Sequence, residues 1–333
     1  MFTSFELKAV TIPNRIVMPA MCQYSATEDG YVTNWHRVHY GTRAVGGVGL
    51  IILEATAVEK RGRLSNHDLG IWDDDQIPGL RELVELGQAH GCVMGIQIAH
   101  GGRKSFGEEL VAPSALAFPK MAAPHALTVS EIKDVVASWR HAARRAHAAG
   151  FDLLQIHGAH GYLIHQFLSP LSNRRTDAYG GSLQNRMRFL VEIVEAVQGE
   201  WPEDRPLSVR LSAVDYLDGG LSVCDTVEIS RTLQDRGVDL MDISSGGLLP
   251  APIKLGPGYQ VPYAEAVKQE VGIPTIAVGL ITKDELAQEI LSNGRADFVA
   301  LGRELLRNPY WVLKAQAKEE IWPWQYHRAM PRS

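Results

Sequence analysis

Short runs of Val, Ile and Leu recur along the chain, and each is followed by a longer segment with the spacing of an amphipathic helix. The apolar runs predict strands at residues 15–18, 48–53, 93–98, 153–156, 207–211, 240–244, 275–278 and 298–301. The longer segments predict helices at residues 34–45, 76–90, 130–149, 185–200, 223–236, 263–270, 283–292 and from Arg303 onward. Strands that alternate with helices build a parallel sheet, and eight of each predict a (β/α)8 TIM barrel.

This even alternation also predicts the domain organisation. A doubly wound open sheet is the competing architecture, but the eightfold repeat within 333 residues favours one closed domain, residues 1–333, with a short N-terminal segment. The longest irregular stretch, residues 105–129, contains Pro113, Pro119 and Pro124. Long loops of this kind are often functional, so we expect a lid over one end of the barrel, after the third strand.

Composition and charge exclude several functional classes. With 45% hydrophobic and 21% charged residues, the chain is typical of globular proteins that bury a large core. The net charge of -5 and the scattered Lys and Arg residues give no sign of a nucleic-acid surface. No run approaches the roughly 18 apolar residues of a membrane span, and the N-terminus lacks the pattern of a signal peptide.

The cysteines indicate the redox compartment. Cys22, Cys92 and Cys224 are three thiols at wide spacings, and an odd number argues against a disulfide framework. Their spacing also differs from that of a zinc site, so we expect no metal. These features predict a cytoplasmic protein.

The active site of a TIM barrel lies where the strands end and the strand-to-helix loops begin. His157, His160 and Tyr162 follow the fourth predicted strand within six residues, and such a cluster is costly unless it binds something. A zinc or iron site completed by His165 is an alternative. It is the weaker one, because no carboxylate has a matching spacing and His165 falls on the following helix.

Gln97 and Arg210 each end an apolar strand and should point into the barrel mouth. A long polar side chain there costs on the order of a few kcal/mol unless it is satisfied. A flat heterocycle with amide-like edges would satisfy both, since Gln97 offers a donor and an acceptor and Arg210 a fixed cation. A buried pair of Arg210 with Asp215 or Asp242 is an equally good interpretation of the residues alone.

The ends of the last two strands suggest a phosphate site. Gly279 follows the seventh strand, and Gly302 and Arg303 follow the eighth. Loops at these places often bind phosphate, because glycines expose backbone N–H groups and a helix N-terminus adds a favourable dipole. The alternative is that the glycines only end strands and that Arg303 lies on the surface.

Four separate motifs occur in order along the chain. They are Asn14-Arg15-Ile16-Val17-Met18-Pro19-Ala20-Met21-Cys22, Gly95-Ile96-Gln97-Ile98-Ala99-His100-Gly101-Gly102-Arg103-Lys104, His157-Gly158-Ala159-His160-Gly161-Tyr162-Leu163, and Phe167-Leu168-Ser169-Pro170 continued by Asn173-Arg174-Arg175-Thr176-Asp177-Ala178-Tyr179-Gly180-Gly181-Ser182. Together they resemble the Old Yellow Enzyme family of FMN-dependent ene-reductases, and the likeness runs from about Phe5 to the C-terminus. Cys22 with Tyr24 resembles the thermophilic-like subclass.

The resemblance implies a role for each matching position. His157 and His160 would hold the substrate carbonyl oxygen, Tyr162 would donate a proton, and Tyr24 and Lys104 would be further active-site residues. Cys22 would tune the flavin's reduction potential. The expected FMN contacts are Pro19, Ala20, Met21, Cys22, Ala55, Gln97, Arg210, Gly279, Leu280, Gly302 and Arg303.

The same resemblance implies a reaction. NADPH or NADH reduces FMN and leaves, and an α,β-unsaturated carbonyl compound then takes hydride at its β-carbon and a proton from Tyr162 at its α-carbon. Two alternatives come from other classes. A flavin-free aldolase is disfavoured because no predicted strand ends in a lysine suited to a Schiff base, and a noncatalytic flavin-binding protein would not need the His157, His160 and Tyr162 cluster.

The C-terminal tail, residues 320–333, is unusually aromatic. It contains Trp322-Pro323-Trp324-Gln325-Tyr326-His327-Arg328, and aromatic residues and Arg are enriched at protein interfaces. Arg328 matches an arginine that, in the resembling subclass, reaches a neighbouring subunit's active site. We therefore expect a homodimer or homotetramer, with packing of the tail against its own barrel as the alternative.

Overall fold

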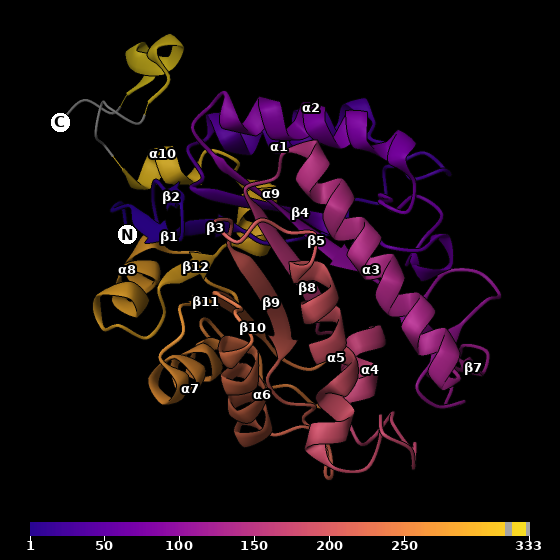
Figure 1. The fold of residues 1–333 in the computed structure, drawn as a ribbon. Helices are drawn as coiled ribbons and strands as arrows, with labels where there is room; N and C mark the ends of the chain where they lie inside the picture. Colours follow the sequence, from indigo (N-terminus) through magenta and orange to yellow (C-terminus); the bar gives the residue numbers. More distant parts are fainter. Residues whose placement is uncertain (317–321, 331–333) are drawn as a thin grey trace.

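The computed structural model describes residues 1–316 and 322–330, which form a closed barrel of eight parallel strands (Figure 1). The predicted (β/α)8 barrel is confirmed, and every predicted strand is present. The barrel closes where Val299 pairs with Ile16. In order around the barrel the strands are β3 (Ile16–Met18), β4 (Leu50–Ala57), β5 (Val93–Ala99), β8 (Leu153–Gly158), β9 (Leu207–Ser212), β10 (Leu240–Ser244), β11 (Thr275–Ala277) and β12 (Phe298–Ala300).

Helices surround the strands on the outside of the barrel (Figure 1). The predicted helices appear with boundaries shifted by one to three residues at most ends. A short helix that the sequence did not predict, α4 (Leu163–Leu168), follows β8 directly. The other helices are α1 (Asn34–Val45), α2 (Ile77–Gln88), α3 (Val129–Ala149), α5 (Leu183–Gln198), α6 (Val223–Asp235), α7 (Val261–Val271), α8 (Asp284–Ser292), α9 (Gly302–Arg307) and α10 (Trp311–Ala315). Short 3-10 helices lie at Lys60–Gly62, Asp74–Gln76, Gly102–Lys104 and Trp324–Ala329.

Two strands extend further toward the mouth than their apolar runs suggest. The run at 48–53 predicts a strand that ends before Glu54, but β4 continues to Ala57 across an irregularity between Leu53 and Thr56. β8 likewise continues beyond the predicted end at Ile156, so that His157 pairs with Arg210 on β9. Ladder hydrogen bonds to the neighbouring strand hold these polar residues in strand conformation, and hydrophobic patterning does not report such bonds.

An N-terminal hairpin closes the far end of the barrel. β1 (Phe5–Leu7) and β2 (Val10–Ile12) pair antiparallel, and Leu7 and Ile12 belong to the apolar cluster inside the barrel. The Phe5 ring packs edge-on against Phe298, with 5.0 Å between centroids. The inside of the barrel is therefore dry at this end, and the polar interior positions are confined to the other.

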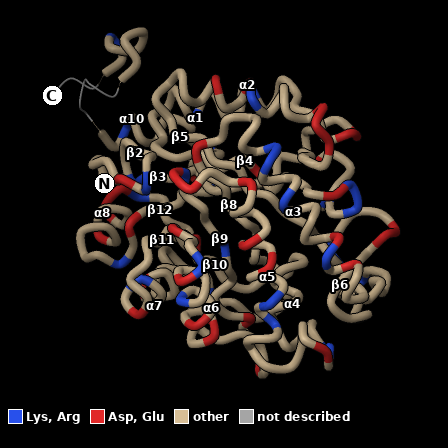
Figure 2. The backbone as a smooth tube through the Cα atoms, in the orientation of Figure 1, with Lys and Arg blue, Asp and Glu red and all other residues tan. Residues whose placement is uncertain are grey.

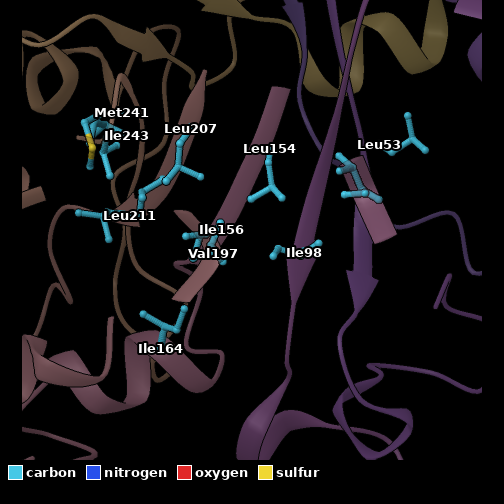
Figure 3. Close-up of a cluster of buried hydrophobic side chains, with 14 of the residues drawn as sticks. Leu53, Ile98, Leu154, Ile156, Ile164, Val197, Leu207, Leu211, Met241 and Ile243 are labelled. Carbon is cyan, nitrogen blue, oxygen red and sulfur yellow. The ribbon is translucent and has the colours of Figure 1, made fainter. Parts of the chain in front are cut away.

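The second core lies between the barrel and its helices. Strand residues alternate between the two faces, so Leu154 and Ile156 face outward while Leu153 joins the interior cluster. Each fully buried aliphatic side chain of this layer stabilises the fold by roughly 1.5–3 kcal/mol. Figure 3 shows members of this layer: Leu53, Ile98, Leu154, Ile156, Ile164, Val197, Leu207, Leu211, Met241 and Ile243.

Residues 105–129 form the irregular segment that the sequence predicts as a lid. It contains a two-residue parallel pairing of β6 (Val111–Ala112) with β7 (His125–Ala126). The Arg175 guanidinium joins the residues that follow these two strands, because it donates to the carbonyl oxygens of Pro113 at 2.9 Å and Leu127 at 2.5 Å. This bridge holds the segment as one unit beside the barrel, and its role as a lid stays a prediction.

Charged residues of both signs are interspersed over the chain (Figure 2). No helix within residues 1–316 and 322–330 is long and apolar enough to cross a membrane.

Candidate active site

The floor of the barrel mouth is a layer of polar side chains that lies directly above the apolar interior. Gln97, Gln155, Arg210 and Asp242 sit on four consecutive strands and are almost completely buried. Gln97 Nε2 donates to Gln155 Oε1 at 2.7 Å, and Gln155 Nε2 donates to Asp242 Oδ2 at 3.3 Å. The two residues that the sequence places in the mouth are thus joined through Gln155 and Asp242.

Arg210 is paired but not satisfied. Its Nε lies 3.3 Å from Asp242 Oδ2, so the alternative of a buried ion pair holds for Asp242 and not for Asp215. That contact lacks hydrogen-bond geometry, and Asp242 Oδ1 has no hydrogen-bond partner among the described residues. The Nη1 atom of Arg210 makes one long contact, 3.5 Å, to the Ala20 carbonyl oxygen. Because a guanidinium carries five N–H donors, Arg210 retains donors for an acceptor-rich ring above the floor, which fits FMN.

A cavity of about 140 Å³ lies between the ends of β11 and β12. A Cβ atom on Gly302 would lie 3.6 Å from Met21 Sδ and 3.9 Å from Pro19 Cγ, so the loops after the first and last barrel strands meet here. Gly279 adopts a φ of 131°, which L side chains rarely take. The predicted phosphate residues Gly279, Gly302 and Arg303 lie together in this lining, beside Leu280, a predicted FMN contact.

The two histidines are neutral. Burial and the nearby Arg210 charge lower the pKa of both His157 and His160 well below the usual value. His157 Nδ1 accepts the backbone N–H of Ala159 at 3.2 Å, so its single proton sits on Nε2. The His160 ring lies 5.2 Å from that of His157 at 86°, and its Nε2 lies 2.8 Å from Ser244 Oγ, which leaves Nδ1 for a ligand.

His160 is held in a strained backbone conformation. Its φ of 58° is left-handed, which is costly for a residue with a side chain. The surroundings impose it: Ser212 Oγ accepts the His160 N–H at 2.9 Å, and Lys104 Nζ donates to the His160 carbonyl oxygen at 2.8 Å. Gly247 packs directly against the turn, since a Cβ there would lie 2.7 Å from the His160 Cα.

A buried pair supports this turn from behind. His165 Nδ1 accepts the Gly161 N–H at 2.8 Å, and His165 Nε2 lies 2.9 Å from Asp215 Oδ1. Both side chains are fully buried. His165 lies on a helix after the strand, as expected, although this helix, α4, is not one of the eight predicted segments. Both its ring nitrogens are engaged, so it cannot complete a metal site with His157 and His160.

Tyr162 completes the cluster. Its ring lies 5.0 Å from that of His157, with Lys104 Nζ 4.8 Å from its centroid. Burial and the negative charges that Cys22 and Tyr24 would carry raise the pKa of Tyr162 above its ordinary value, so it is a neutral phenol. Burial, reinforced by Arg103, lowers the pKa of Lys104 to about 8. The site therefore combines a proton donor with a cation that is easily neutralised.

The loop after β3 carries Cys22 and Tyr24. Burial raises the pKa of the Cys22 thiol to about 12, with Asp68 and Glu54 adding to the shift, so the thiol is not an activated nucleophile. Tyr24 is 57% exposed and has a φ of 52°. The buried Glu54 carboxylate fixes this loop by accepting the Gln23 N–H at 2.6 Å. Ala55, a predicted FMN contact, is buried on the same strand as Glu54.

Several supporting residues were not predicted as part of the site. Gln155, Glu54, Ser244 and Gln260 are buried and hydrogen-bonded in or beside the mouth, and so is Asp242, which the sequence offered only as an alternative partner of Arg210. A polar residue inside an otherwise apolar strand was the signal that could have revealed Gln155 and Asp242.

Arg328 is the predicted site residue that its own chain does not bring to the mouth. It is exposed on the Trp324–Ala329 helix. The adjacent residues 322–326 face residues 13–14, 44–48 and 89–91, which precede β3, β4 and β5. Residues 322–330 therefore lie toward the opposite end of the barrel, beyond α10 on the side of the N-terminus (Figure 1), and the rest of the predicted tail lies outside the described residues. A role for Arg328 in substrate binding requires a second copy of the chain.

Comparison with known proteins agrees with this geometry. The model of the NADH:flavin oxidoreductase / NADH oxidase family matches residues 1–321. An NADPH dehydrogenase of Geobacillus sp. (strain WCH70) is 56% identical over 322 residues, 96% of this chain and 94% of that protein. Morphinone reductase superposes with a TM-score of 0.83 at 30% identity, over 96% of this chain and 92% of that one.

Two further solved structures have the same fold. An old yellow enzyme homologue from Zymomonas mobilis gives a TM-score of 0.81 at 27% identity, over 100% of this chain and 99% of that one. A 2-naphthoyl-CoA reductase gives 0.89 at 26% identity over 93% of this chain, which spans 51% of that longer protein. The predictions of an enzyme, of FMN and of a nicotinamide reductant are confirmed by these matches. The chain belongs to the NADH:flavin oxidoreductase / NADH oxidase family, and the predicted kinship with Old Yellow Enzyme is correct.

Proposed function

We propose that the protein is an ene-reductase, which reduces the activated C=C bond of α,β-unsaturated carbonyl compounds. The observation that carries this proposal is the pair of neutral imidazoles of His157 and His160, 5.2 Å apart, with the neutral phenol of Tyr162 beside them. Such a cluster can hold an oxygen and deliver a proton. The name of morphinone reductase, a structural neighbour, is consistent with a ketone substrate.

The proposed cofactor site uses the residues that line the floor and the cavity. Bound FMN supplies the hydride. Arg210 would offer its unused donors and its charge to the flavin ring, beside Gln97, and the cavity at Gly279 and Arg303 would take the phosphate. The remaining proposed contacts are Pro19, Ala20, Met21, Cys22, Ala55, Leu280 and Gly302.

The histidines would act on the substrate oxygen. His157 Nε2 and His160 Nδ1 are the nitrogens left for a ligand. Negative charge grows on the oxygen as hydride reaches the β-carbon, so hydrogen bonds to it strengthen in the transition state. Neutral imidazoles suit this task, because each keeps one N–H donor and needs no proton exchange with solvent.

Tyr162 would then protonate the α-carbon. Its raised pKa keeps the proton on the phenol until an enolate forms, and Lys104 lies close enough to stabilise the phenolate that remains. Tyr24, at the exposed edge of the site, would contact the rest of the substrate. NADPH or NADH would bind at the same face of the flavin as the substrate, before the substrate binds.

The test is turnover of 2-cyclohexenone by FMN-loaded protein with NADPH and with NADH. His157→Ala and His160→Ala should each lower kcat by about 10²–10³, the usual cost of one lost oxyanion donor. His141→Ala, an exposed histidine on α3, is the matched control and should not change it. A wild-type protein that reduces no enone, maleimide or nitroalkene would refute the proposal.

The alternatives account for less of the site. A flavin-free aldolase is inconsistent with the family, and the amine of Lys104 is occupied by the carbonyl oxygens of His160 and Gly247 at 2.8 and 3.1 Å. A noncatalytic flavin-binding protein would leave the strained turn at His160 without a purpose.

A further inference from the structure

A chain of hydrogen bonds lies behind His160. Ser244 ends β10 and Ser245 follows it, while Tyr216 lies after β9. Gln260 precedes α7 and Tyr263 lies on it, and Ser244, Ser245 and Gln260 are buried. The contacts are Tyr263 Oη to Tyr216 Oη (3.3 Å), Tyr216 Oη to Ser245 Oγ (2.8 Å), Ser245 Oγ to Gln260 Oε1 (2.7 Å), Ser244 Oγ to the same oxygen (3.1 Å), and Ser244 Oγ to His160 Nε2 (2.8 Å). The chain thus ends on a histidine that the proposed function assigns to the substrate oxygen.

The position of one proton decides whether His160 can donate a hydrogen bond to the substrate oxygen. A neutral imidazole has a single N–H, on Nδ1 or on Nε2, and the bond made by the other nitrogen selects between them. For His157 the backbone N–H of Ala159 makes the selection. Among the described residues, the His160 ring is hydrogen-bonded to the Ser244 hydroxyl alone, which can donate or accept.

The hydrogen-bond chain favours donation to His160. Tyr216 gives its proton to Ser245, so Ser245 gives its own proton to Gln260 Oε1. That oxygen therefore already has one donor, at 2.7 Å, and the single proton of the Ser244 hydroxyl has two candidate acceptors, Gln260 Oε1 and His160 Nε2. The Ser244 hydroxyl lies nearer to His160 Nε2, at 2.8 Å, than to Gln260 Oε1, at 3.1 Å.

We propose that Ser244 is a positioning residue that donates its hydroxyl proton to His160 Nε2 and thereby keeps the His160 proton on Nδ1. The hydrogen-bond geometry of Ser244 and His160 is independent of the proposed function, but the effect of this tautomer on the substrate rests on it. Nδ1–H would then face the substrate oxygen as a donor. The other tautomer would present a lone pair to an oxygen that is gaining negative charge, and the hydrogen bond would be lost.

The first test reads the tautomer directly. Protein labelled with [15N]histidine should show, in two-bond 1H–15N correlations, a protonated Nδ1 for His160, whose signals are assigned by their loss in His160→Ala. Ser244→Val should raise the Nε2-protonated form of His160. A wild-type His160 with its proton on Nε2 overturns the proposal, whatever the enzyme's activity.

The second test reads ligand binding through the absorbance of FMN-loaded protein titrated with phenol. Ser244→Thr and Ser244→Val have the same shape and differ only in the hydroxyl, so crowding affects both alike. We expect Thr to bind phenol within about twofold of wild type and Val about tenfold more weakly, the usual value of one hydrogen bond. Ser230→Ala, which truncates a buried serine on α6 bonded to the Thr226 carbonyl oxygen, is the matched control.

The outcomes separate the two proposals. Ser244 does not act through His160 if Ser244→Thr and Ser244→Val weaken phenol binding equally. The same holds if the effect of Ser244→Val on phenol binding adds fully to that of His160→Ala. Unchanged phenol binding in His160→Ala itself would instead remove His160 from the oxygen site and so contradict the proposed function. A Val effect that vanishes in the His160→Ala background supports the inference.

Discussion

Arg210 and Asp242 form an ion pair on neighbouring strands of the barrel floor, with 3.3 Å between Nε and Oδ2. The pair means that a buried negative charge lies beside the cation proposed to face the flavin. Burial raises the pKa of Asp242, and Arg210 and Gln155 work in the opposite direction. The floor is therefore electrostatically balanced before any cofactor binds.

Replacing Asp242 by Asn should raise the reduction potential of bound FMN. The substitution keeps the size of the side chain but leaves the whole Arg210 charge to stabilise a reduced flavin. We expect a rise on the order of 30 mV, about 1.4 kcal/mol for two electrons, in a dye-coupled redox titration. Asp239→Asn, just before the other end of β10, is the control. A potential that falls or stays constant would contradict the proposed place of the flavin.

Asp215→Asn should destabilise the protein in a pH-dependent way. Burial raises the pKa of Asp215, but bonds from His165, Ser169 and the Leu221 N–H outweigh it, so the net pKa is lowered. A carboxylate with a lowered native pKa stabilises the fold above its unfolded pKa of about 4 and loses that contribution as the pH falls through the native value. We expect a loss of about 3 kcal/mol at pH 7, measured by urea unfolding, because one partner of a buried pair is weakened.

The same comparison at pH 3 supplies the check. At pH 3, which is below the unfolded pKa of about 4, the carboxylate is protonated in the unfolded chain, so the free energy of unfolding of the wild type should move toward that of Asp215→Asn. A difference between the two proteins that is the same at both pH values would mean that the charge of Asp215 does not stabilise the turn.

Gly247→Ala should damage the oxygen site more than the fold. Gly247 has a φ of 88°, and a Cβ there would lie 2.7 Å from the His160 Cα, so the turn must move. Gly219→Ala is a matched control with a φ of 72° and open space around its Cβ position. Both should lose about 1–2 kcal/mol of stability to backbone strain. Phenol binding should weaken in Gly247→Ala alone, and equal phenol affinities in the two variants would refute the contact.

Cys22 should resist alkylation. The thiolate is the reactive form, and the pKa of Cys22 is raised to about 12. Cys224 is exposed and should react first with iodoacetamide. Peptide mass spectrometry between pH 7 and 10 should show little alkylation of Cys22. The plot of Cys22 alkylation rate against pH should have no inflection near pH 8. An inflection there would show that Cys22 is an activated thiol.

Arg328 should affect substrate binding only through a second subunit. Within one chain, residues 322–326 lie at the opposite end of the barrel from the mouth. We expect a dimer or tetramer by light scattering, a smaller species when the chain ends before Trp322, and a raised KM for 2-cyclohexenone in Arg328→Ala. An unchanged oligomer and an unchanged KM would favour packing of the tail against its own barrel.

The location of the site was predictable, but its internal pairing was not. Gln97 and Arg210 end apolar strands, and this local fact places them at the mouth. The choice of Asp242 over Asp215 as the partner of Arg210 was not available from the sequence. Asp215 instead bonds to His165, 50 residues away along the chain, and the pairing of β8 with β9 brings these side chains together.

The sequence by itself determined the eight strands, most of the helices and the family, because apolar spacing and motif order are local properties of the chain. The tertiary structure decided the rest: the N-terminal hairpin that closes the barrel, the short helix α4, and the left-handed turn at His160. Those features depend on hydrogen bonds between residues far apart in sequence, such as Ser244 with His160, and burial makes each such bond costly to leave unmade.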